Sequence, residues 1–301
     1  MYDIIIVGAG PAGLTAAIYA SRASNKVLVL EAKAYGGQII NTLDIENYPA
    51  YKHISGFDFA TNLYDQATSL GANILYEKVL DINNLGDMKE VITKKNTYKT
   101  KAIILATGSE NRKLGIDLED SLVGKGISYC ATCDGAFYKN KTVAVVGGGN
   151  TALEDAMYLT DICKKVYLIH RRSEFRGEDT TVRKLKEKDN IQFIYNSNVT
   201  KLIVDKRLTG IEVTNNDGIV KNIDVDGLFV AVGRIPENQN FAKLINLDEA
   251  GYIVANEDCK TNVPGIFVAG DNRVKEVRQL VTAASDGATA ALASVKYVNN
   301  L

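Results

Sequence analysis

Two cysteines separated by two small residues are the most reactive arrangement in this sequence. Cys130 and Cys133 enclose Ala-Thr, and Asp134 follows directly. Two thiols at this spacing can close a small disulfide and open it again, and a helix beginning here would favour thiolate over thiol through its backbone amides. Asp134 is placed to pass a proton to or from a leaving thiolate, which dithiol exchange needs at some step. By itself the pattern indicates redox or metal chemistry.

Counting ligands separates these two chemistries. A zinc site needs about four ligands, but the remaining cysteines, Cys163 and Cys259, stand far away and singly, and neither histidine completes a pair. A structural disulfide is disfavoured in a reducing cytosol. We therefore predict a redox dithiol and no metal. Cys163 is expected to be a small buried hydrophobic residue and Cys259 an incidental surface thiol. For Asp134, a side-chain-to-backbone turn before Gly135 stays an alternative.

The chain opens with a pattern for binding a dinucleotide. An apolar strand at 4–7 leads into Gly8-Ala9-Gly10-Pro11-Ala12-Gly13 and a helix-compatible run at 14–20. The first glycine permits the tight turn, the second lets a pyrophosphate approach the backbone, and the third lets helix pack on strand. A second strand at 27–30 ends at Glu31, where a carboxylate can bind a ribose hydroxyl and would repel a 2′-phosphate. Such a turn alone also suits a tight loop, but the whole order predicts a nucleotide site.

The same unit recurs in the middle of the chain. A strand at 141–146 leads into Gly147-Gly148-Gly149-Asn150-Thr151-Ala152, with Ala152 in place of the third glycine, and then into a helix at about 153–161. The next strand, 166–169, ends at basic residues instead of an acid: His170, Arg171, Arg172 and then Arg176. Arginines pair bidentately with phosphate, so this end favours the 2′-phosphate of NADPH over a merely solvated basic corner. FAD at the first unit and NADPH at the second satisfy both ribose ends.

The first unit does not finish before the second begins. Strand-like 102–106 ends in Thr107-Gly108, and a near echo of it lies far downstream at 265–271. We predict an α/β fold with two Rossmann-like domains: an NADPH domain (115–240), carrying the dithiol, inserted into an FAD domain built from 1–114 and 241–301. Two linkers at one place make a natural hinge.

Two further features complete the predicted architecture. Alternating stretches at 91–99 and 209–225 are expected to form β-hairpins packed over the Rossmann sheets. The Ala-rich segment 280–298 is expected to be a helix.

Composition limits the partners. The formal charge of −1 removes any global attraction to nucleic acid or an anionic membrane. No apolar run approaches the ~20 residues that span a bilayer, and no positively charged stretch precedes the first strand, so a signal peptide is not expected. We expect a cytoplasmic enzyme that binds neither nucleic acid nor membrane.

With these motifs in hand, the chain resembles the low-molecular-weight thioredoxin reductases over essentially its whole length. The motifs that carry the resemblance are both glycine turns, Gly36-Gly37-Gln38, Glu46-Asn47-Tyr48-Pro49, Ala106-Thr107-Gly108, Cys130 to Gly135, His170-Arg171-Arg172 with Phe175-Arg176, Gly270-Asp271 and Arg278-Gln279. The resemblance implies a homodimeric flavoprotein that passes electrons from NADPH through FAD to the dithiol and then to thioredoxin.

The resemblance also implies a role for each matching residue. Cys133 would face the flavin, and Cys130 would attack the disulfide of thioredoxin. Asp271 would lie at the ribityl and pyrophosphate region of FAD, and the three arginines would clamp the 2′-phosphate. The cofactor-binding residues expected from motif and resemblance together are Gly8, Gly10, Pro11, Ala12, Gly13, Glu31, Gly37, Gln38, Asn47, Thr107, Gly108, Gly147, Gly149, Asn150, Thr151, His170, Arg171, Arg172, Arg176, Gly270, Asp271, Arg278 and Gln279.

The sequence departs from the family pattern in two places. Gly177 stands where relatives often have alanine, and the run at 233–238 differs slightly from the usual Gly-x-x-Pro-Asn. Some relatives have lost the second glycine motif and the arginines and take electrons from ferredoxin or deazaflavin. This chain keeps both features, which favours NADPH.

The resemblance further implies a rotation of the inserted domain. Nicotinamide and dithiol lie on one domain, both must contact the same flavin ring, and both need near-contact geometry. Rotation on the two linkers would present them in turn.

Several alternatives remain open. The same flavin and dithiol could serve a peroxidase, in relatives that usually carry an extra N-terminal thioredoxin-like region, or could pass electrons to oxygen in a dithiol oxidase. A ferredoxin–NADP reductase lacks the dithiol. From another class, a redox sensor would bind NADPH but turn over negligibly.

Overall fold

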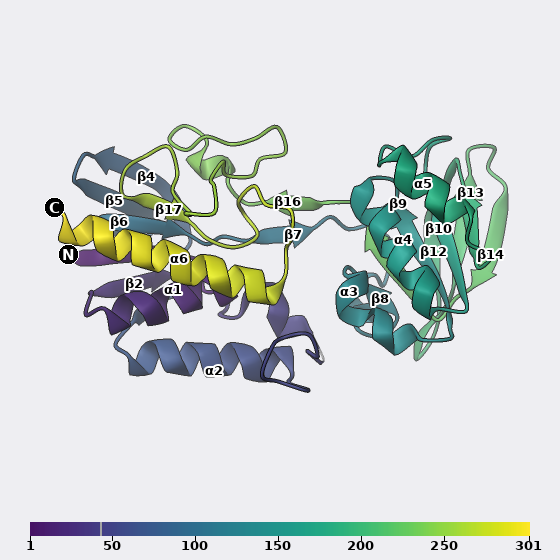
Figure 1. Ribbon diagram of the computed structural model, residues 1–301, viewed down its shortest axis with the longest axis horizontal. Coiled ribbons are helices and arrows are strands. Elements are labelled where there is room, and N and C mark those ends of the chain that lie inside the picture. The colour runs from purple at the N-terminus through teal and green to yellow at the C-terminus, as the bar shows by residue number, and fades with distance from the viewer. Residues whose placement is uncertain (43) are drawn as a thin grey trace. The chain divides into compact units, whose positions relative to one another are not determined.

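The chain forms two compact units in the computed structural model, which describes residues 1–42 and 44–301 (Figure 1). One unit combines the two ends of the chain, Met1–Glu110 and Ile235–Leu301, and the other is the continuous segment Asn111–Arg234. The chain passes between them in β7 (Ser109–Asn111) and β16 (Arg234–Pro236), which pair as a two-stranded sheet. The second unit is therefore an insertion within the first.

A seven-stranded sheet forms the core of the first unit, in the order β3-β2-β1-β6-β5-β4 with β17 also paired to β6. Its parallel strands are β1 (Tyr2–Val7), β2 (Val27–Leu30), β3 (Asn73–Leu75), β6 (Thr97–Leu105) and β17 (Ile266–Val268). Residues 4–7 of β1 and all of β2 are aliphatic because both faces of these strands are buried, one under helices and the other under the β4–β5 hairpin and the segment 241–263.

The predicted hairpin at 91–99 forms, and its packing over the sheet is confirmed: Val79, Ile82 and Val91 share an apolar core with the parallel strands, through Ile5, Leu28 and Ile103. β4 (Val79–Leu85) and β5 (Met88–Thr93) are antiparallel, and β5 pairs in turn with the first half of β6. The second half of β6 pairs with β17. The hairpin is therefore also continuous with the nucleotide-binding sheet, because the nine-residue β6 is long enough to pair with both β5 and β17.

Helices α1 (Pro11–Arg22), α2 (Gly56–Ser69) and α6 (Leu280–Asn299) complete the first unit, together with the short 3-10 turns η1 (Gly37–Asn41) and η4 (Gln239–Phe241). The predicted C-terminal helix is confirmed as α6, which lies along α1 in Figure 1. A Cβ on Gly287 of α6 would meet the backbone oxygen of Ala12 at 2.3 Å. The two helices thus approach as closely as glycine allows, which fixes the C-terminal segment on the first glycine turn.

The second unit has a five-stranded parallel sheet in the order β11-β10-β9-β15-β8. The strands are β8 (Ile127–Ser128), β9 (Thr142–Gly147), β10 (Lys165–Ile169), β11 (Ile191–Ile194) and β15 (Gly227–Ala231). Its helical elements are α3 (Ala131–Asp134), α4 (Asn150–Ile162), α5 (Asp179–Lys186), η2 (Asp120–Leu122) and η3 (Gly135–Tyr138).

An antiparallel sheet covers one face of this unit. It consists of β12 (Ser197–Asp205), β13 (Arg207–Asn215) and β14 (Val220–Asp224). Ile211, Val213 and Ile223 share an apolar core with Ala144 and Leu228 of the parallel sheet. The prediction of a hairpin packed over the sheet at 209–225 is therefore confirmed, with β12 added to it.

No helix among residues 1–42 and 44–301 is long and apolar enough to cross a membrane.

Candidate functional site: a dithiol and two dinucleotide turns

Cys130 and Cys133 form a disulfide in the second unit, with their Cα atoms 5.3 Å apart. Cys130 is the extended residue that precedes α3, and Cys133 lies within this short helix. Cys130 is half-buried, while Cys133 is exposed. The sulfur of Cys130 lies 3.4 Å from the hydroxyl of Thr132. The predicted pairing of the two cysteines is thus realised, at the end of β8 where the chain leaves the sheet.

The carboxyl group of Asp134 is held beside this disulfide turn by Ser128. Ser128 Oγ lies 2.6 Å from Asp134 Oδ2 and accepts a hydrogen bond from the Cys130 backbone N–H at 3.1 Å. Among the described residues, the Asp134 side chain thus bonds to the Ser128 hydroxyl, whereas the alternative interpretation expected it to bond to the backbone of its own turn. Burial raises the pKa of Asp134 above its ordinary value, and the hydrogen bond from Ser128 opposes that rise. A raised pKa suits a group that must both take and release a proton near neutral pH.

A second carboxyl group lies at the same turn and was missed by sequence reasoning. Asp155 of α4 accepts a hydrogen bond from the backbone N–H of Ala131, which lies between the two cysteines, and burial raises its pKa to about 7. α4 packs under the turn so closely that a Cβ on Gly135 would come within 2.8 Å of Tyr158. An acid in the middle of an amphipathic helix carries no motif, so only the fold reveals it.

The first glycine turn has the geometry that its spacing predicted. A Cβ on Gly13 would lie 1.9 Å from the oxygen of Gly8, so α1 packs directly on β1. Gly10 is open: the nearest atom to a Cβ placed there is the Cα of Gly37, at 4.0 Å. The two glycines leave a surface free of side chains before the N-terminus of α1, where backbone amides can meet a pyrophosphate. These residues fit FAD.

Glu31 closes this turn from the end of β2. Its Oε2 accepts a hydrogen bond from the Ala9 N–H at 2.7 Å, and its Oε1 accepts one from the Lys33 N–H at 2.8 Å. Each carboxylate oxygen keeps a second lone pair. The carboxylate is therefore oriented by the backbone and can still accept hydrogen bonds from ribose hydroxyls.

The remaining residues expected at FAD come together from distant parts of the first unit. Asn47 Nδ2 donates to Gln279 Oε1 at 3.3 Å across 232 positions of sequence. The guanidinium of Arg278 lies 4.2 Å from the centre of the Tyr252 ring. The hydroxyl of Thr107 accepts a hydrogen bond from the buried Asn272 side chain at 3.0 Å.

Beneath Gly270-Asp271 lies a buried ionic group that sequence reasoning missed. Asp286 of α6 accepts a hydrogen bond from the Gly270 N–H at 3.0 Å and forms ion pairs with Arg273 and Lys275, each at 2.9 Å. Arg273 and Asp286 are almost fully buried. The paired charges hold the turn that carries Asp271, since breaking a buried pair is costly.

The second glycine turn repeats the first with two changes. A Cβ on Gly149 would meet nothing within 4 Å, so the approach to the helix remains open and fits a second pyrophosphate. Ala152 is fully buried, which shows that its methyl group fits the helix–strand contact. Where Glu31 closes the first turn, His170 closes the second: its ring occupies the space that a side chain on Gly148 would need. The ring is buried and stacked on Phe175.

The three arginines surround this histidine. Arg171, Arg172 and Arg176 have exposed side chains. Burial lowers the pKa of His170, and the positive charges of the three guanidinium groups lower it further. The imidazole is therefore neutral at pH 7, and the positive charge at this end of the sheet belongs to the arginines.

The arginine segment is tied to the glycine turn through backbone contacts. The Arg176 N–H donates to the Gly148 oxygen at 2.7 Å, and the Glu178 N–H donates to Asn150 Oδ1 at 2.8 Å. Gly177 packs so closely that a Cβ would lie 3.0 Å from the Asn150 nitrogen and 2.5 Å from the flexible end of Leu153. In this chain the glycine at 177 therefore belongs to a close backbone approach.

The other two cysteines are both buried. Cys163 lies at the C-terminus of α4 and is buried, as predicted for a small apolar side chain. Burial raises its pKa to about 11. The expectation that Cys259 is a surface thiol was wrong: it is fully buried against the backbone of Asp286, and burial raises its pKa to about 12. The polar residues around it in the sequence point outward, while its side chain joins the core under α6.

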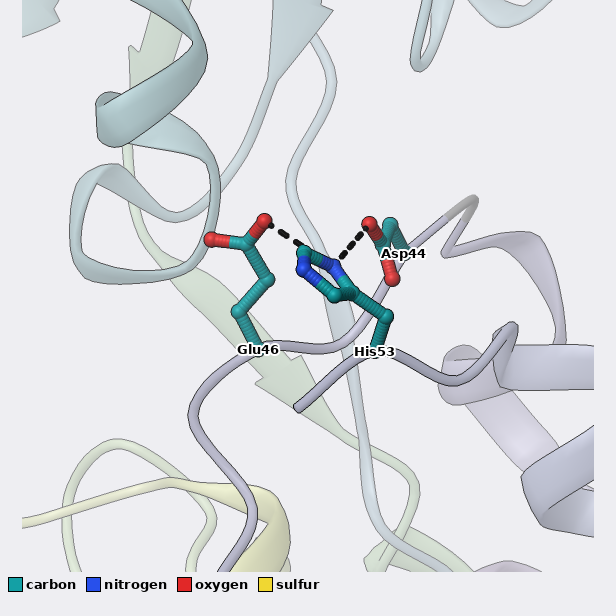
Figure 2. A group of neighbouring side chains, drawn as sticks. All are labelled: Asp44, Glu46 and His53. Carbon is teal, nitrogen blue, oxygen red and sulfur yellow. Dashed lines mark hydrogen bonds and ion pairs between the residues drawn. The ribbon is translucent and has the colours of Figure 1, made fainter. Parts of the chain in front are cut away.

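One exposed group combines a histidine with two acids. His53 Nδ1 lies 2.9 Å from Asp44 Oδ2 and 3.3 Å from Glu46 Oε1, and Figure 2 shows the ring between the two carboxylates. The hydrogen bond to Asp44 raises the pKa of His53. A protonated imidazole paired with two acids explains this geometry.

Comparisons with known proteins agree with this site. Residues 2–288 match the family model described as pyridine nucleotide-disulphide oxidoreductase. A thioredoxin reductase from Listeria monocytogenes is 43% identical over 303 residues, covering 100% of this chain and 95% of the relative. The crystal structure of thioredoxin reductase from Streptococcus pyogenes is 39% identical with a TM-score of 0.96, covering 100% and 99% of the two chains.

A third relative is similarly identical in sequence, but its structure superposes less well on this chain. Lactococcus lactis thioredoxin reductase, in a structure described as the FR conformation, is 40% identical with a TM-score of 0.69, and each chain is covered in full.

These matches confirm the predicted fold class, with its FAD-type and NADPH-type Rossmann units, and the predicted flavoprotein oxidoreductase class. With a disulfide, two dinucleotide turns and full-length relatives in agreement, the chain belongs to the thioredoxin reductase family of pyridine nucleotide-disulphide oxidoreductases.

Proposed function

We propose that this protein is an NADPH-dependent thioredoxin-disulfide reductase, working as a cytoplasmic homodimer. The observation that carries the proposal is the Cys130–Cys133 disulfide with Asp134 beside it, on the same unit as the turn that ends in three exposed arginines. The unit Met1–Glu110 with Ile235–Leu301 binds FAD, and the unit Asn111–Arg234 binds NADPH.

Residues of the first unit hold FAD. The amides at Gly10 and Ala12 would meet the pyrophosphate, Glu31 would accept from a ribose hydroxyl, and Asp271 would lie at the ribityl and pyrophosphate region. Gln38, Asn47, Arg278 and Gln279 complete the site. FAD, when bound, supplies two-electron transfer from the nicotinamide hydride to a disulfide.

Residues of the second unit hold NADPH. The turn at 147–151 would meet the pyrophosphate, and Arg171, Arg172 and Arg176 would pair with the 2′-phosphate, which a neutral His170 neither attracts nor repels strongly. If NADPH were placed in the first unit instead, the carboxylate of Glu31 would repel its 2′-phosphate. This difference assigns one nucleotide to each unit.

The dithiol then carries out exchange with the partner. Two electrons break the Cys130–Cys133 bond, and the two sulfurs leave as one thiol and one thiolate, with Asp134 holding or returning the proton. The Cys130 thiolate attacks the disulfide of thioredoxin and expels one partner thiolate, which is protonated. Cys133 attacks the resulting mixed disulfide, releases the second partner thiol and restores the Cys130–Cys133 bond.

The inserted unit rotates between the two half-reactions. Nicotinamide and dithiol both need near-contact with the reacting ring, and one face cannot hold both. The two solved relatives support this step. At nearly equal identity their TM-scores are 0.96 and 0.69, as expected if the two units take different relative positions among relatives.

An anaerobic experiment on Cys133→Ser tests the proposal. We expect NADPH to reduce the flavin of this variant at close to the wild-type rate, while NADPH-dependent reduction of thioredoxin is lost. Cys163→Ala, at a buried cysteine away from the exchange, is the control and should retain both activities. The proposal is wrong if wild-type protein reduces its flavin with NADPH but leaves thioredoxin oxidised. Peroxide release from small dithiols without NADPH would instead identify a dithiol oxidase.

A further inference from the structure

The hydroxyl of Ser128 joins the Asp134 carboxyl group to the backbone of the dithiol turn. Ser128 is the last residue of β8, which pairs in parallel with β15, and its side chain is 3% exposed. Its Oγ lies 2.6 Å from Asp134 Oδ2, 3.1 Å from the Cys130 nitrogen and 3.2 Å from the Cys130 oxygen. A single atom fixed by the sheet therefore contacts both the acid and the first cysteine.

These three contacts can be assigned for each protonation state of Asp134. A serine hydroxyl has one hydrogen and two lone pairs. When Asp134 is ionised, the Ser128 hydroxyl donates to Oδ2, and 2.6 Å is the length of an O–H···O⁻ bond. When Asp134 is protonated, it donates to Ser128 Oγ, and the hydroxyl turns to donate to the Cys130 oxygen. The Cys130 N–H occupies the other lone pair in both states.

We infer that Ser128 is the positioning residue of the proton-transferring acid: its hydroxyl rotor keeps Asp134 bonded to the dithiol turn whether the acid holds a proton or not. The inference rests on the proposed function only in assigning proton transfer to Asp134. Ser128 itself exchanges no proton with the sulfurs. It preserves the position of the acid while the charge of the acid changes, so that only the hydroxyl hydrogen of Ser128 turns at each transfer.

The charges around the acid are consistent with this role. Burial raises the pKa of Asp134, and the bond from Ser128 is what opposes the rise. The titratable groups nearest to it are the Cys130–Cys133 pair on its own turn and Tyr138 on η3, whose pKa is raised by burial and by the charge of Asp134 and is lowered by Arg207. Arg207 acts on Tyr138, but among the described residues no cation acts on the pKa of Asp134 itself, and Ser128 alone opposes the effect of burial.

The consequence is a defined effect of removing the hydroxyl. In Ser128→Ala the carboxylate loses its donor, and the pKa of Asp134 rises further. The pH at which the carboxylate becomes available as a base should then move upward by about one unit, since a hydrogen bond to a charged group is typically worth that much. Below that pH, exchange should slow about tenfold.

The experiment measures the dithiol without NADPH or thioredoxin. Full-length flavoprotein is reduced with a small dithiol, freed of reductant and mixed with 4,4′-dithiodipyridine between pH 5 and 9. We expect the acid limb of the Ser128→Ala rate profile to lie about one pH unit above wild type. Ser128→Thr, which keeps a hydroxyl, should restore the wild-type limb. Ser197→Ala removes an equally buried serine hydroxyl of the same unit that bonds to Tyr195, and its profile should not move.

A double-mutant cycle separates positioning from general damage. If Ser128 acts through Asp134, then Ser128→Ala should have no further effect in an Asp134→Asn background. The inference is overturned if Ser128→Ala keeps the wild-type pH profile, or if it slows Asp134→Asn by the same factor as it slows wild type. Wild-type protein that reacts with the small disulfide but fails with thioredoxin would contradict the proposed function and leave this inference standing.

Discussion

The carboxylate of Asp155 on α4 accepts a hydrogen bond from the backbone N–H of Ala131, between the two cysteines of the dithiol. Ala131 is fully buried and Asp155 is half-buried. The contact anchors the dithiol turn to the helix that follows the second glycine motif. It also places an acid with a pKa of about 7 directly under the reactive turn.

This pKa predicts a pH-dependent contribution to stability. The folded-state pKa of Asp155, about 7, lies above the ordinary value of 3.8, so the folded protein binds this proton more tightly than the unfolded chain. Stability contributed by the proton is complete below the lower value and is lost as pH rises through the folded pKa. Relative to Asp155→Asn, wild type should therefore lose stability from about pH 4 to about pH 7.

Thermal unfolding of both proteins across this range checks the prediction. Asp161→Asn is the matched control, since Asp161 lies on the same helix and is exposed. In the described part of the chain it forms a salt bridge with Lys188. The Tm difference between Asp161→Asn and wild type should not change with pH in the way expected for Asp155→Asn. A Tm difference between wild type and Asp155→Asn that stays constant with pH would contradict the raised pKa.

The arginine cluster predicts a cofactor preference. Replacing Arg171 and Arg172 by alanine should raise the KM for NADPH by at least about 100-fold, because each lost bond to a charged group is worth roughly one order of magnitude or more. The KM for NADH should change by less than about threefold, because NADH lacks the phosphate. Flavin reduction kinetics with both nucleotides measure this, and Arg183→Ala, an exposed arginine on α5, is the control. Equal effects on NADPH and NADH would remove the arginines from the phosphate site.

Burial of the two remaining thiols predicts their reactivity. Cys163 and Cys259 have raised pKa values of about 11 and about 12, and the thiolate is the reactive form. Reduced native protein should therefore react rapidly with a thiol reagent at Cys130 and Cys133 only, whereas all four cysteines of the sequence should react after denaturation. Mass mapping of the labelled peptides identifies the sites. Rapid native labelling of Cys259 would mean that the core under α6 opens readily.

A strained turn predicts a stabilising substitution. The Tyr51 N–H donates to the Tyr48 oxygen at 3.2 Å across Pro49 and Ala50, and Ala50 has a φ of 80°. Proline then a positive φ is the pattern of a type II turn, which favours glycine at the third position. Ala50→Gly should raise Tm by about 1–3 °C, after the greater unfolded-state entropy of glycine is subtracted. Ala23→Gly, at a residue with φ of −86°, should not raise it.

Local spacing was enough to predict the motifs of this protein whose residues lie within a few positions of one another in the chain. The turns at Gly8–Gly13 and Gly147–Ala152 follow from a strand, a tight bend and a helix in immediate succession, and the disulfide follows from two residues between cysteines. Their chemistry depends on atoms a few positions apart, so the order of residues nearly determines the geometry. The insertion of one α/β unit into another was also visible, because each unit ends in its own apolar strand and glycine.

Only the tertiary structure decided which side chains support those motifs. Asp155 and Asp286 reach the dithiol and the Gly270 turn from distant helices, and no local pattern marks them. The same reason explains the error at Cys259, whose polar sequence neighbours hide a side chain that packs under α6. Sequence spacing sets what a short segment can do chemically. Burial, and with it the pKa of each neighbouring acid or thiol, depends on contacts between segments far apart in the chain.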